Sequence, residues 1–594
     1  MGWVIGLFAL GATLFLIARQ PGFRVPAQRI AAQGAGAARE EDSARRLRRL
    51  VIAGFLAALL PLLPGELRYH GDERFYTDGA LHMLQSGDYL TPVYADGRPR
   101  FLKPGLSYWL IAATWKVFGI SLAGSRLPAL LAATGTLWLA GRTVLALGGS
   151  QSASLLAVSV LASNMSLLLA AVRSTPDALL CLFLSMSLFG FLQIIVREDR
   201  RPVAYALAYL GAGLAVAAKG LLGLVPVLFS FAFCLLGRRR GAPSPRALVH
   251  APMMAAGAAV GLFWFVAVLL EHGAAAWAGF FADQIGGKME GSQLRAIGNV
   301  PRYLLAALRH FLPWSALAVV GWLALRQGAP AAARQSRMTG LYALGAFSII
   351  VAIFSAGRDF RPRYLLPVYP LLAVALAPRL ERWLGAPGHQ AALRLLRVAV
   401  AIVGIGGGVA ICAIGWALDQ RIASAGFALA SAAALVLAAS RRGWRTAVAG
   451  TAILLVSALP LFELVVRPVI DAQPARLAAA RITALERAPA RVGLLGVGSE
   501  FAGLLSLHLE GRVAVTAVEA WPVHGTPPPV LVTTEAHRDD LLDRGYRLEA
   551  CGYLQRRWTL RDLRHALDQG GIAPYLRHTT IPLYIALGGE PAAP

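Results

Sequence analysis

Long apolar segments separated by short loops constrain the fold of this chain more than any other feature. Hydrophobic residues make up 57% of its 594 residues and charged residues only 15%. Many of the apolar runs are long enough to cross about 30 Å of hydrocarbon, which predicts a polytopic helical membrane protein. We expect about thirteen core spans, near 51–67, 127–147, 151–171, 178–196, 203–218, 220–237, 252–270, 305–325, 339–355, 364–378, 398–418, 424–439 and 446–464.

The distribution of charge predicts the orientation of these spans. A net charge of +25 would suggest a nucleic-acid partner in a soluble protein, but here the arginines fall mainly in short loops between apolar segments, as in cytoplasmic loops. We therefore expect no nucleic acid and a multi-pass protein of the bacterial inner membrane. The same alternation assigns several polar groups to the periplasmic face, namely Asp72, Asp177, Lys219, the loop 271–302, the arginines between 358 and 363 and the C-terminal tail.

The chain divides by composition into four regions. The apolar residues 2–18 are followed, not preceded, by positive charge, which favours an uncleaved helix over a signal peptide. We expect an extra N-terminal transmembrane helix at 1–20, a basic cytoplasmic linker at 21–49, a transmembrane domain at 50–466 and a periplasmic α/β domain at 467–594.

The tail beyond residue 467 combines short apolar runs with polar segments. We expect strands at 512–518 and 529–534 and a polar helix beginning near Glu535. The glycines at 496–503 suit a strand-to-helix turn better than a nucleotide loop, because the full glycine pattern of such loops is missing. The four cysteines are scattered through the chain and form neither a metal motif nor a disulfide framework, so we interpret them as packing residues.

A polar island at 71–104 is where we expect the chemistry, because ionisable groups beside a bilayer are costly unless they are solvated, paired or used. Asp72 directly follows a span, and Tyr76 would share its face if the segment continues as a helix. Asp72 suits a general base, although a helix cap or a solvated loop acid is the more common role. The following apolar segment, 106–119, is short and predicts an interfacial helix.

Three further ionisable residues have both a functional and a structural interpretation. Lys103 could hold a lipid phosphate or serve as an anchor at the interface. Lys219 lies between two apolar spans joined by almost no loop, where a lysine usually neutralises an anion or faces a polar cavity. Asp177 follows Ser, Thr and Pro, so it could cap a helix as well as take part in a site.

These motifs together resemble one family. The segment 72–110, followed by GSRLPALL at 124–131, resembles the first external loop of the GT-C membrane glycosyltransferases related to the 4-amino-4-deoxy-L-arabinose lipid A transferase and the protein O-mannosyltransferases. Matches follow in the same order at RSTPDALL, AKGLLGLVP, HFLPW and RPRYLLPVYPLLAVAL. The resemblance implies an all-α polytopic membrane protein of GT-C type, with about thirteen core transmembrane helices, an extra N-terminal helix and a small C-terminal α/β periplasmic domain.

The family's function is the expectation for this chain. The resemblance implies an inverting glycosyltransferase that moves a sugar from a polyprenyl-phosphate donor, such as undecaprenyl phosphate, to a periplasmic acceptor, which could be lipid A, another glycan, a lipid or a protein. The alternative is a multispan lipid or solute transporter. Transporters more often contain internal repeats and mid-membrane ionisable groups, whereas the polar groups here gather at one face.

The resemblance also implies roles for individual residues of this chain, from their positions in the matched motifs. The resemblance implies that Asp72 and Asp177 are catalytic acids and that Lys103 and Lys219 contact the donor phosphate. The family has an arginine where this chain has Phe75, and we expect the neighbouring Arg74 to replace it and to contact the donor phosphate. Substrate contacts are expected from a further group: Glu73, Tyr76, Arg361 and Arg363.

One departure concerns a metal. Leu102 replaces an acid that precedes the lysine in family members, and the loop 271–302 has Asn299 near its end instead of a histidine. We therefore expect no essential metal and no other cofactor. Asp283, Lys288 and Glu290 in that loop are either acceptor contacts or solvated residues.

Overall fold

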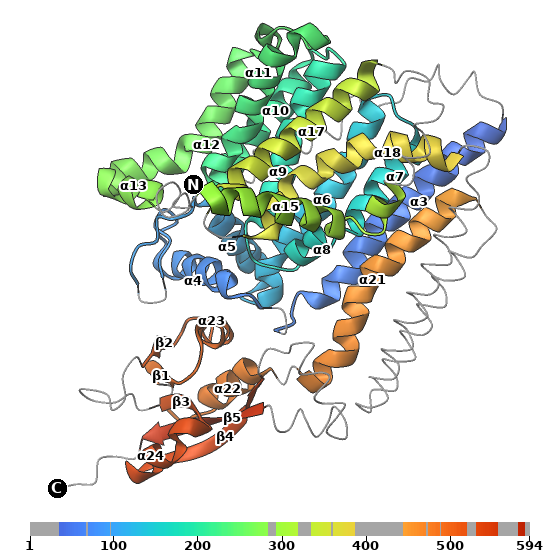
Figure 1. Ribbon diagram of the computed structural model, residues 1–594. Coiled ribbons are helices and arrows are strands. Elements are labelled where there is room, and N and C mark those ends of the chain that lie inside the picture. The colour runs from blue at the N-terminus through green and yellow to red at the C-terminus, as the bar shows by residue number, and fades with distance from the viewer. Residues whose placement is uncertain are drawn as a thin grey trace.

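The computed structural model describes residues 35–66, 69–94, 97–282, 293–318, 334–357, 360–385, 443–470, 473–487, 489–518, 530–555 and 580–588. They form a helical body with a small α/β domain at one end (Figure 1). The predicted helix at 1–20, the predicted spans at 398–418 and 424–439, and the candidates Asp283, Lys288 and Glu290 lie outside the described residues.

Several described helices have the length and composition of membrane spans. Five meet both conditions, and a sixth span results if α7 (Gln151–Ala162) and α8 (Met165–Ala171), which are bent by 67° relative to each other, are counted as one. The mainly helical, membrane-spanning character expected from the sequence is confirmed, while the full number of spans remains a prediction. The five single spans are α6 (Leu122–Ala146), α9 (Asp177–Val196), α10 (Pro202–Lys219), α12 (Ala251–His272) and α17 (Arg334–Ser355).

Helix α9 is the centre of the helical body. It is apolar on all sides, and 94% of its most apolar window is buried, as expected of a helix with no face left to lipid. It packs closely on α10 because glycines face the partner backbone. A Cβ at Gly190 would lie 2.3 Å from the Ala208 nitrogen, and one at Gly211 would lie 2.6 Å from the Ser187 nitrogen. This antiparallel pair brings the start of α9 beside the end of α10.

The remaining helices surround this pair. Two of them, α3 and α21, run side by side along one flank (Figure 1). The other described helices of the body are α3 (Ala35–Leu59), α4 (Gly71–Ser86), α5 (Leu106–Phe118), α11 (Val225–Gly237), α13 (Ala274–Phe281), α15 (Gln293–His310), α18 (Tyr369–Gly385) and α21 (Trp444–Ile470), with 3₁₀ turns η2 (Leu60–Leu62), η3 (Leu221–Leu224), η4 (Arg238–Arg240), η5 (Pro245–Leu248) and η7 (Pro362–Val368).

Two elements differ from the expectation. The basic segment assigned to a linker is helical from Ala35, so α3 is continuous through Arg45 and Arg48. It is held there because Arg48 donates hydrogen bonds to Gln151 (2.8 Å) and Ser154 (2.6 Å). The span expected at 305–325 is also different in its described part, where α15 begins at Gln293, ends at His310 and exposes apolar residues such as Leu305 and Leu308. Its apolar residues lie on one face and its polar residues on the other, which is typical of an amphipathic helix.

In the described part of the C-terminal domain, five strands form a mixed sheet with the order β2-β1-β3-β5-β4. Its first three strands are parallel and the other two pairs antiparallel. The predicted strands and the strand-to-helix turn at 496–503 are present. The elements are α22 (Pro474–Thr483), β1 (Arg491–Leu495), α23 (Ser499–His508), β2 (Ala514–Ala517), β3 (Val530–Thr534), η8 (Glu535–His537), α24 (Arg538–Asp543), β4 (Tyr546–Gln555) and β5 (Thr580–Gly588).

Helix α23 connects this domain to the helical body by packing on α4, as Figure 1 shows. His508 and Glu66 lie 2.6 Å apart across the contact, and Gln85 donates to the Glu510 carbonyl at 3.3 Å. A glycine makes the approach possible, since a Cβ at Gly503 would lie 2.6 Å from the Tyr69 hydroxyl. The domain therefore rests directly on the helix that carries Asp72.

Candidate active site

The polar island forms the helix expected of it, and Asp72 lies in the first turn of that helix. The cap of α4 is His70, whose Nδ1 accepts a hydrogen bond from the Asp72 backbone nitrogen at 3.1 Å. The proton of a neutral His70 ring is therefore on Nε2. Carboxylates in a first turn interact favourably with the positive end of the helix dipole, so the sequence order His, Gly, Asp, Glu builds an acidic helix start.

Three other helix ends contribute charged residues to the same place. Asp177 is the first residue of α9, Lys219 is the last residue of α10, and Arg363 lies in η7. Asp177 and Lys219 have the sign that their helix ends favour, an acid at the start of α9 and a cation at the end of α10. The close packing of α9 and α10 therefore brings Asp177 and Lys219 together.

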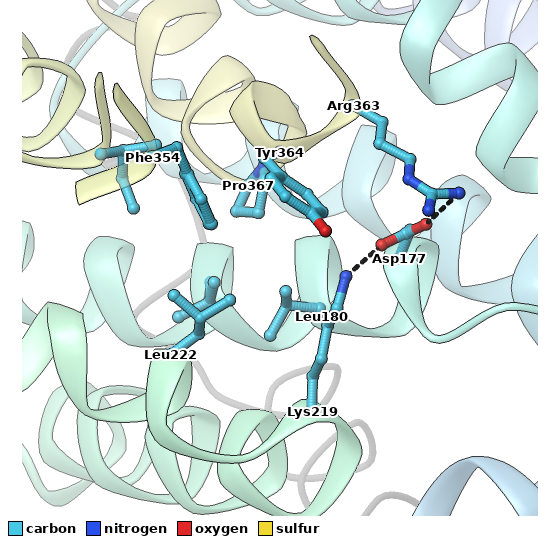
Figure 2. Close-up of a pocket in the computed structure, with 10 residues that line it drawn as sticks. Asp177, Leu180, Lys219, Leu222, Phe354, Arg363, Tyr364 and Pro367 are labelled. Carbon is cyan, nitrogen blue, oxygen red and sulfur yellow. Dashed lines mark hydrogen bonds and ion pairs between the residues drawn. The ribbon is translucent and has the colours of Figure 1, made fainter. Parts of the chain in front are cut away.

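Arg363 links the two candidate catalytic acids. It donates from Nη2 to Asp72 Oδ2 at 2.7 Å, and its Nη1 lies 4.0 Å from Asp177 Oδ2. Lys219 donates to the other oxygen of Asp177. Figure 2 shows Asp177 between the two cations. The structure thus gathers four of the predicted site residues, although they are far apart in the sequence.

The pocket beside these charges is polar at one end and apolar along its length. Its cavity volume is only about 10 Å³, room for about one water molecule, and the ring of Tyr364 lies over Lys219 Nζ at 5.3 Å from the ring centroid (Figure 2). The apolar wall comes from the membrane-spanning helices α9 and α17 together with η3 and η7. The residues of this wall are Leu180, Leu184, Leu222, Ile350, Phe354 and Pro367. The lining suits a molecule with an anionic head and a hydrocarbon chain, and the side chains must move apart to admit it.

The charge state of Asp72 follows from its surroundings. Burial raises the pKa of this carboxyl, but the hydrogen bond and charge of Arg363 outweigh burial, and the net pKa is below its usual value. For His70, burial and then the charges of Arg173 and Arg363 lower the pKa. At neutral pH, Asp72 is ionised and able to accept a proton, while His70 is neutral.

Glu73 departs from its expected role as a substrate contact, because it is fully buried. Its Oε2 accepts from Arg126 Nε and the Ser174 nitrogen, both at 2.8 Å, and its Oε1 accepts from Arg126 Nη2 at 3.0 Å and the His70 nitrogen at 2.9 Å. Arg126 also donates to the carbonyls of Leu63 and Gly65. We therefore assign Glu73 to holding the fold of the site, out of a substrate's reach.

Tyr76 is also buried, with 5% of its surface exposed. Its ring packs 5.3 Å from that of Tyr108, and the Arg100 guanidinium lies over the Tyr76 ring at 5.7 Å. Arg100 donates to the Tyr108 hydroxyl at 2.5 Å. Tyr76 belongs to the aromatic wall behind Asp72, where substrate contact would need this wall to open.

The remaining predicted residues lie around the charge cluster. Arg74 pairs with Asp78 at 3.0 Å and faces α23, since its Cγ would lie 2.7 Å from a Cβ at Gly503. This position does not bring it to the pocket expected for a phosphate. Lys103 is half-buried and is not among the residues that line the pocket. Arg361 lowers the pKa of Asp72 through its charge, which agrees with a place near the site.

Among the residues that the structure describes, no group of three or more His, Cys, Asp or Glu side chains could hold a metal ion. Asn299, which stands where a histidine was expected, is buried and donates to the Ser355 carbonyl at 3.4 Å. Its side chain joins α15 to the end of α17.

Comparisons with known proteins show what the chain is similar to. Residues 59–255 match the family described as dolichyl-phosphate-mannose-protein mannosyltransferase. An undecaprenyl phosphate-alpha-4-amino-4-deoxy-L-arabinose arabinosyl transferase of Edwardsiella ictaluri is 29% identical over 69% of this chain and 76% of its own. The crystal structure of ArnT from Cupriavidus metallidurans bound to undecaprenyl phosphate is similar with a TM-score of 0.65 and 21% identity, covering 92% of this chain and 98% of that one. The chain resembles the GT-C polyprenyl-phosphate-sugar glycosyltransferases.

The extent of this resemblance differs between relatives. An uncharacterized protein of Aquifex aeolicus is 29% identical over 54% of this chain, and the match spans only 63% of that protein's length. The likeness to the ArnT structure establishes the fold, since 21% identity is too low to carry a function. The GT-C resemblance expected from the first loop is nevertheless confirmed by the family match, which covers that loop and extends through Asp177 and Lys219.

Sequence reasoning missed several residues of this site. Arg126 and Arg173 lie within the matched motifs GSRLPALL and RSTPDALL but received no role. Their position inside motifs was the available signal. His70 directly precedes the island and was passed over because histidine is not a common helix cap.

Proposed function

We propose that this protein is an inverting glycosyltransferase that uses a polyprenyl-phosphate-linked sugar, such as an undecaprenyl-phosphate sugar, as its donor. The observation that carries the proposal is the pocket in which Lys219 and Arg363 flank Asp177 at the end of an apolar wall. A polyprenyl phosphate has the matching form, with a phosphate head and a long hydrocarbon chain. The names of the arabinosyl transferase relatives support the same donor class.

The proposed reaction is a single displacement at the anomeric carbon. The acceptor hydroxyl passes its proton to the Asp72 carboxylate as its oxygen forms a bond to that carbon. The bond from the anomeric carbon to the phosphate oxygen breaks, and its electron pair leaves with polyprenyl phosphate. Lys219 and Arg363 stabilise the negative charge that develops on the phosphate. Because Arg363 keeps the pKa of Asp72 low, Asp72 is a modest base and takes the proton late, when the hydroxyl has become acidic.

Asp177 has a supporting role in this scheme. It holds Lys219 and lies close to Arg363, so it fixes both cations in the absence of donor. Arrival of a phosphate gives these cations a second anion to bind. We keep Lys103 as a further candidate for the donor phosphate on the resemblance alone.

The acceptor remains open within the proposal. The charges of the loops support a site on the periplasmic face, where lipid A, another envelope glycan, a lipid or a protein would supply the hydroxyl. Arg361, whose charge acts on Asp72, is the candidate to contact a phosphorylated acceptor or a lipid headgroup. The competing function, transport of a lipid or solute, shares the binding of a polyprenyl phosphate but not the need for Asp72 as a base.

Binding of undecaprenyl phosphate tests the donor site directly. Native mass spectrometry of the full-length protein would compare wild type, Lys219→Gln and Lys103→Gln, with Arg201→Gln as control because Arg201 is exposed and pairs with Asp199. We expect selective binding that weakens about tenfold or more in Lys219→Gln and is unchanged in the control. A well-folded wild type that prefers no polyprenyl phosphate over other anionic lipids would contradict the proposal.

A further inference from the structure

The motif HFLPW, residues 310–314, lies in the part of the chain that resembles the family, but the proposed reaction does not use it. His310 is the last residue of α15, and the motif packs on the bend between α7 and α8. Asn164 donates from Nδ2 to the His310 carbonyl at 3.1 Å. Trp314, which is fully buried, donates from Nε1 to the Ser163 hydroxyl at 2.8 Å. The motif is therefore attached to the bend at both of its ends.

The ring of His310 lies between two hydroxyls that come from different segments. Its Nδ1 is 2.9 Å from Ser166 Oγ and 2.9 Å from the Tyr369 hydroxyl. Ser166 belongs to α8 and Tyr369 is the first residue of α18, and both residues are buried. A buried hydroxyl that loses its hydrogen-bond partner is costly, so one ring nitrogen holds both segments.

These two segments lead to opposite partners of the charge cluster. Helix α8 is followed by the loop 172–176 and then by Asp177. The turn η7, which contains Arg363, directly precedes Tyr369. Arg363 Nη1 lies 4.0 Å from Asp177 Oδ2. His310 therefore connects the chain next to Asp177 with the chain next to Arg363.

The packing of η7 makes this connection effective. The residues between Tyr364 and Tyr369 are buried. The Cys181 thiol, one helical turn after Asp177, donates to the Leu366 carbonyl at 3.6 Å. Close-packed segments transmit a displacement instead of absorbing it. A shift of Tyr369 is therefore passed along η7 to Arg363.

Helix α15 also holds the other end of η7. The Tyr303 hydroxyl accepts from the Arg361 nitrogen at 3.2 Å, just before η7 begins. Asn299 donates to the Gly357 carbonyl at 3.5 Å. Asn299, Tyr303 and His310 follow one another at intervals of four and seven residues, so they share one face of α15. That face binds the chain on both sides of η7.

We propose that His310 is a positioning residue, which holds Arg363 in place against Asp177 by binding Tyr369 on one side and Ser166 on the other. His310 is not among the residues that line the donor pocket, so it acts through Arg363 and not by contact with the donor there. The inference rests on the proposed function, in which Arg363 stabilises the departing phosphate, and it adds the residue that places this cation.

Energetic coupling between Tyr369 and Arg363 tests the positioning role. Binding of undecaprenyl phosphate would be measured in phosphatidylcholine nanodiscs for the full-length wild type, Tyr369→Phe, Arg363→Gln and the double variant. Tyr369→Phe keeps the ring and removes only the hydroxyl that lies beside His310. We expect it to weaken binding about threefold or more in the wild type and to have no further effect in Arg363→Gln.

A matched control separates positioning from a general loss of stability. Tyr205 is buried, and its hydroxyl donates to the Ala247 carbonyl in η5 at 2.8 Å. Tyr205→Phe therefore also removes a hydrogen-bonded hydroxyl, and we expect it to leave the affinity for undecaprenyl phosphate unchanged.

Substitutions of His310 itself test the same link from the other side. His310→Phe should weaken binding as Tyr369→Phe does, and His310→Asn should recover part of the loss, because the asparagine amide is as many bonds from Cα as Nδ1 is. Equal losses in His310→Phe and His310→Asn would overturn the role of the ring nitrogen.

The outcomes separate this inference from the proposed function. Unchanged affinity in Tyr369→Phe, an equal loss with and without Arg363, or an equal loss in Tyr205→Phe would overturn the positioning role, even if Lys219→Gln weakens binding as the proposed function requires. A wild type that binds no undecaprenyl phosphate would contradict the proposed function instead. The same cycle is then read from the midpoints of thermal unfolding, where non-additive changes support the link between Tyr369 and Arg363 and additive changes overturn it.

Discussion

Glu73 and Arg126 form a buried ion pair that joins four segments around the candidate active site. The two side chains are 0% and 1% exposed, and their Nε to Oε2 distance is 2.8 Å. Through the hydrogen bonds to the Leu63 and Gly65 carbonyls and the Ser174 nitrogen, the pair connects the turn after η2, the start of α4, α6 and the loop before α9. It therefore fixes the position of Asp72, the neighbour of Glu73, relative to Asp177.

Removing one partner of this pair is predicted to destabilise the protein strongly. Glu73→Gln leaves Arg126 buried without its counter-charge, which costs roughly 3–5 kcal/mol. The midpoint of thermal unfolding should fall, and the double variant Glu73→Gln/Arg126→Met should be less destabilised than the sum of its single variants. Additive effects of the two substitutions would show that the pair does not act as a unit. Arg201→Gln, at an exposed pair, provides the control.

Asp78 is predicted to make stability depend on pH. Burial raises the pKa of Asp78 to about 6 from its ordinary 3.8, and the charge of Arg74 offsets only part of this effect. Because the folded state holds the proton more tightly than the unfolded state, this stabilising contribution is complete at low pH and is lost as the pH rises through about 6. The loss at pH 8 is on the order of 3 kcal/mol.

The variant Asp78→Asn should therefore be more thermostable than the wild type at pH 8, and the gap should nearly close at pH 4. Thermal unfolding of both proteins at the two pH values measures this. An equal difference in thermal stability between the variant and the wild type at pH 4 and pH 8 would mean that Asp78 does not titrate with a raised pKa. The result bears on the contact between the two domains, since Arg74, the partner of Asp78, faces α23.

The docking of α23 on α4 is predicted to depend on Gly503. A Cβ at this position would lie 2.6 Å from the Tyr69 hydroxyl and 2.7 Å from Arg74 Cγ, so Gly503→Ala forces the helices apart. We expect faster limited proteolysis between the helical body and the α/β domain, together with reduced activity. Gly498→Ala is the matched control, because a Cβ there meets nothing within 4 Å. Identical behaviour of the two variants would argue against a role for this contact in holding α4.

The sequence predicted the candidate site better than it predicted how the site is held. Asp72, Asp177, Lys219 and Arg363 were all named as candidates, because charged residues at the ends of apolar segments are conspicuous, and the structure brings them together. The pairing of Glu73 with Arg126 was not foreseen, since 53 residues separate them and neither neighbouring sequence indicates the partner. Glu73 was grouped with Asp72 as a functional acid, although adjacent helix residues face different directions and Glu73 points into the body.

The helices of the fold also differ in how well the sequence predicted them. Uniformly apolar helices such as α9 were located to within a residue or two, because their composition alone defines them. Helix α15 was not predicted with its observed bounds, Gln293–His310, because its apolar residues lie on one face only. The apolar residues around position 312 suggested instead a span that begins at residue 305. Helix α3 was started too late because its basic first half was interpreted as a linker.

The most direct test of the account is donor turnover by Asp72→Asn. Wild type and variant would be incubated with a panel of undecaprenyl-phosphate-linked sugars and an envelope lipid extract as acceptor, and the release of undecaprenyl phosphate would be measured. We predict release by the wild type and a loss of about 10²- to 10⁴-fold in Asp72→Asn, which should still bind undecaprenyl phosphate. Turnover by Asp72→Asn equal to that of the wild type, or undecaprenyl phosphate binding by the wild type without consumption of any donor, would contradict the account.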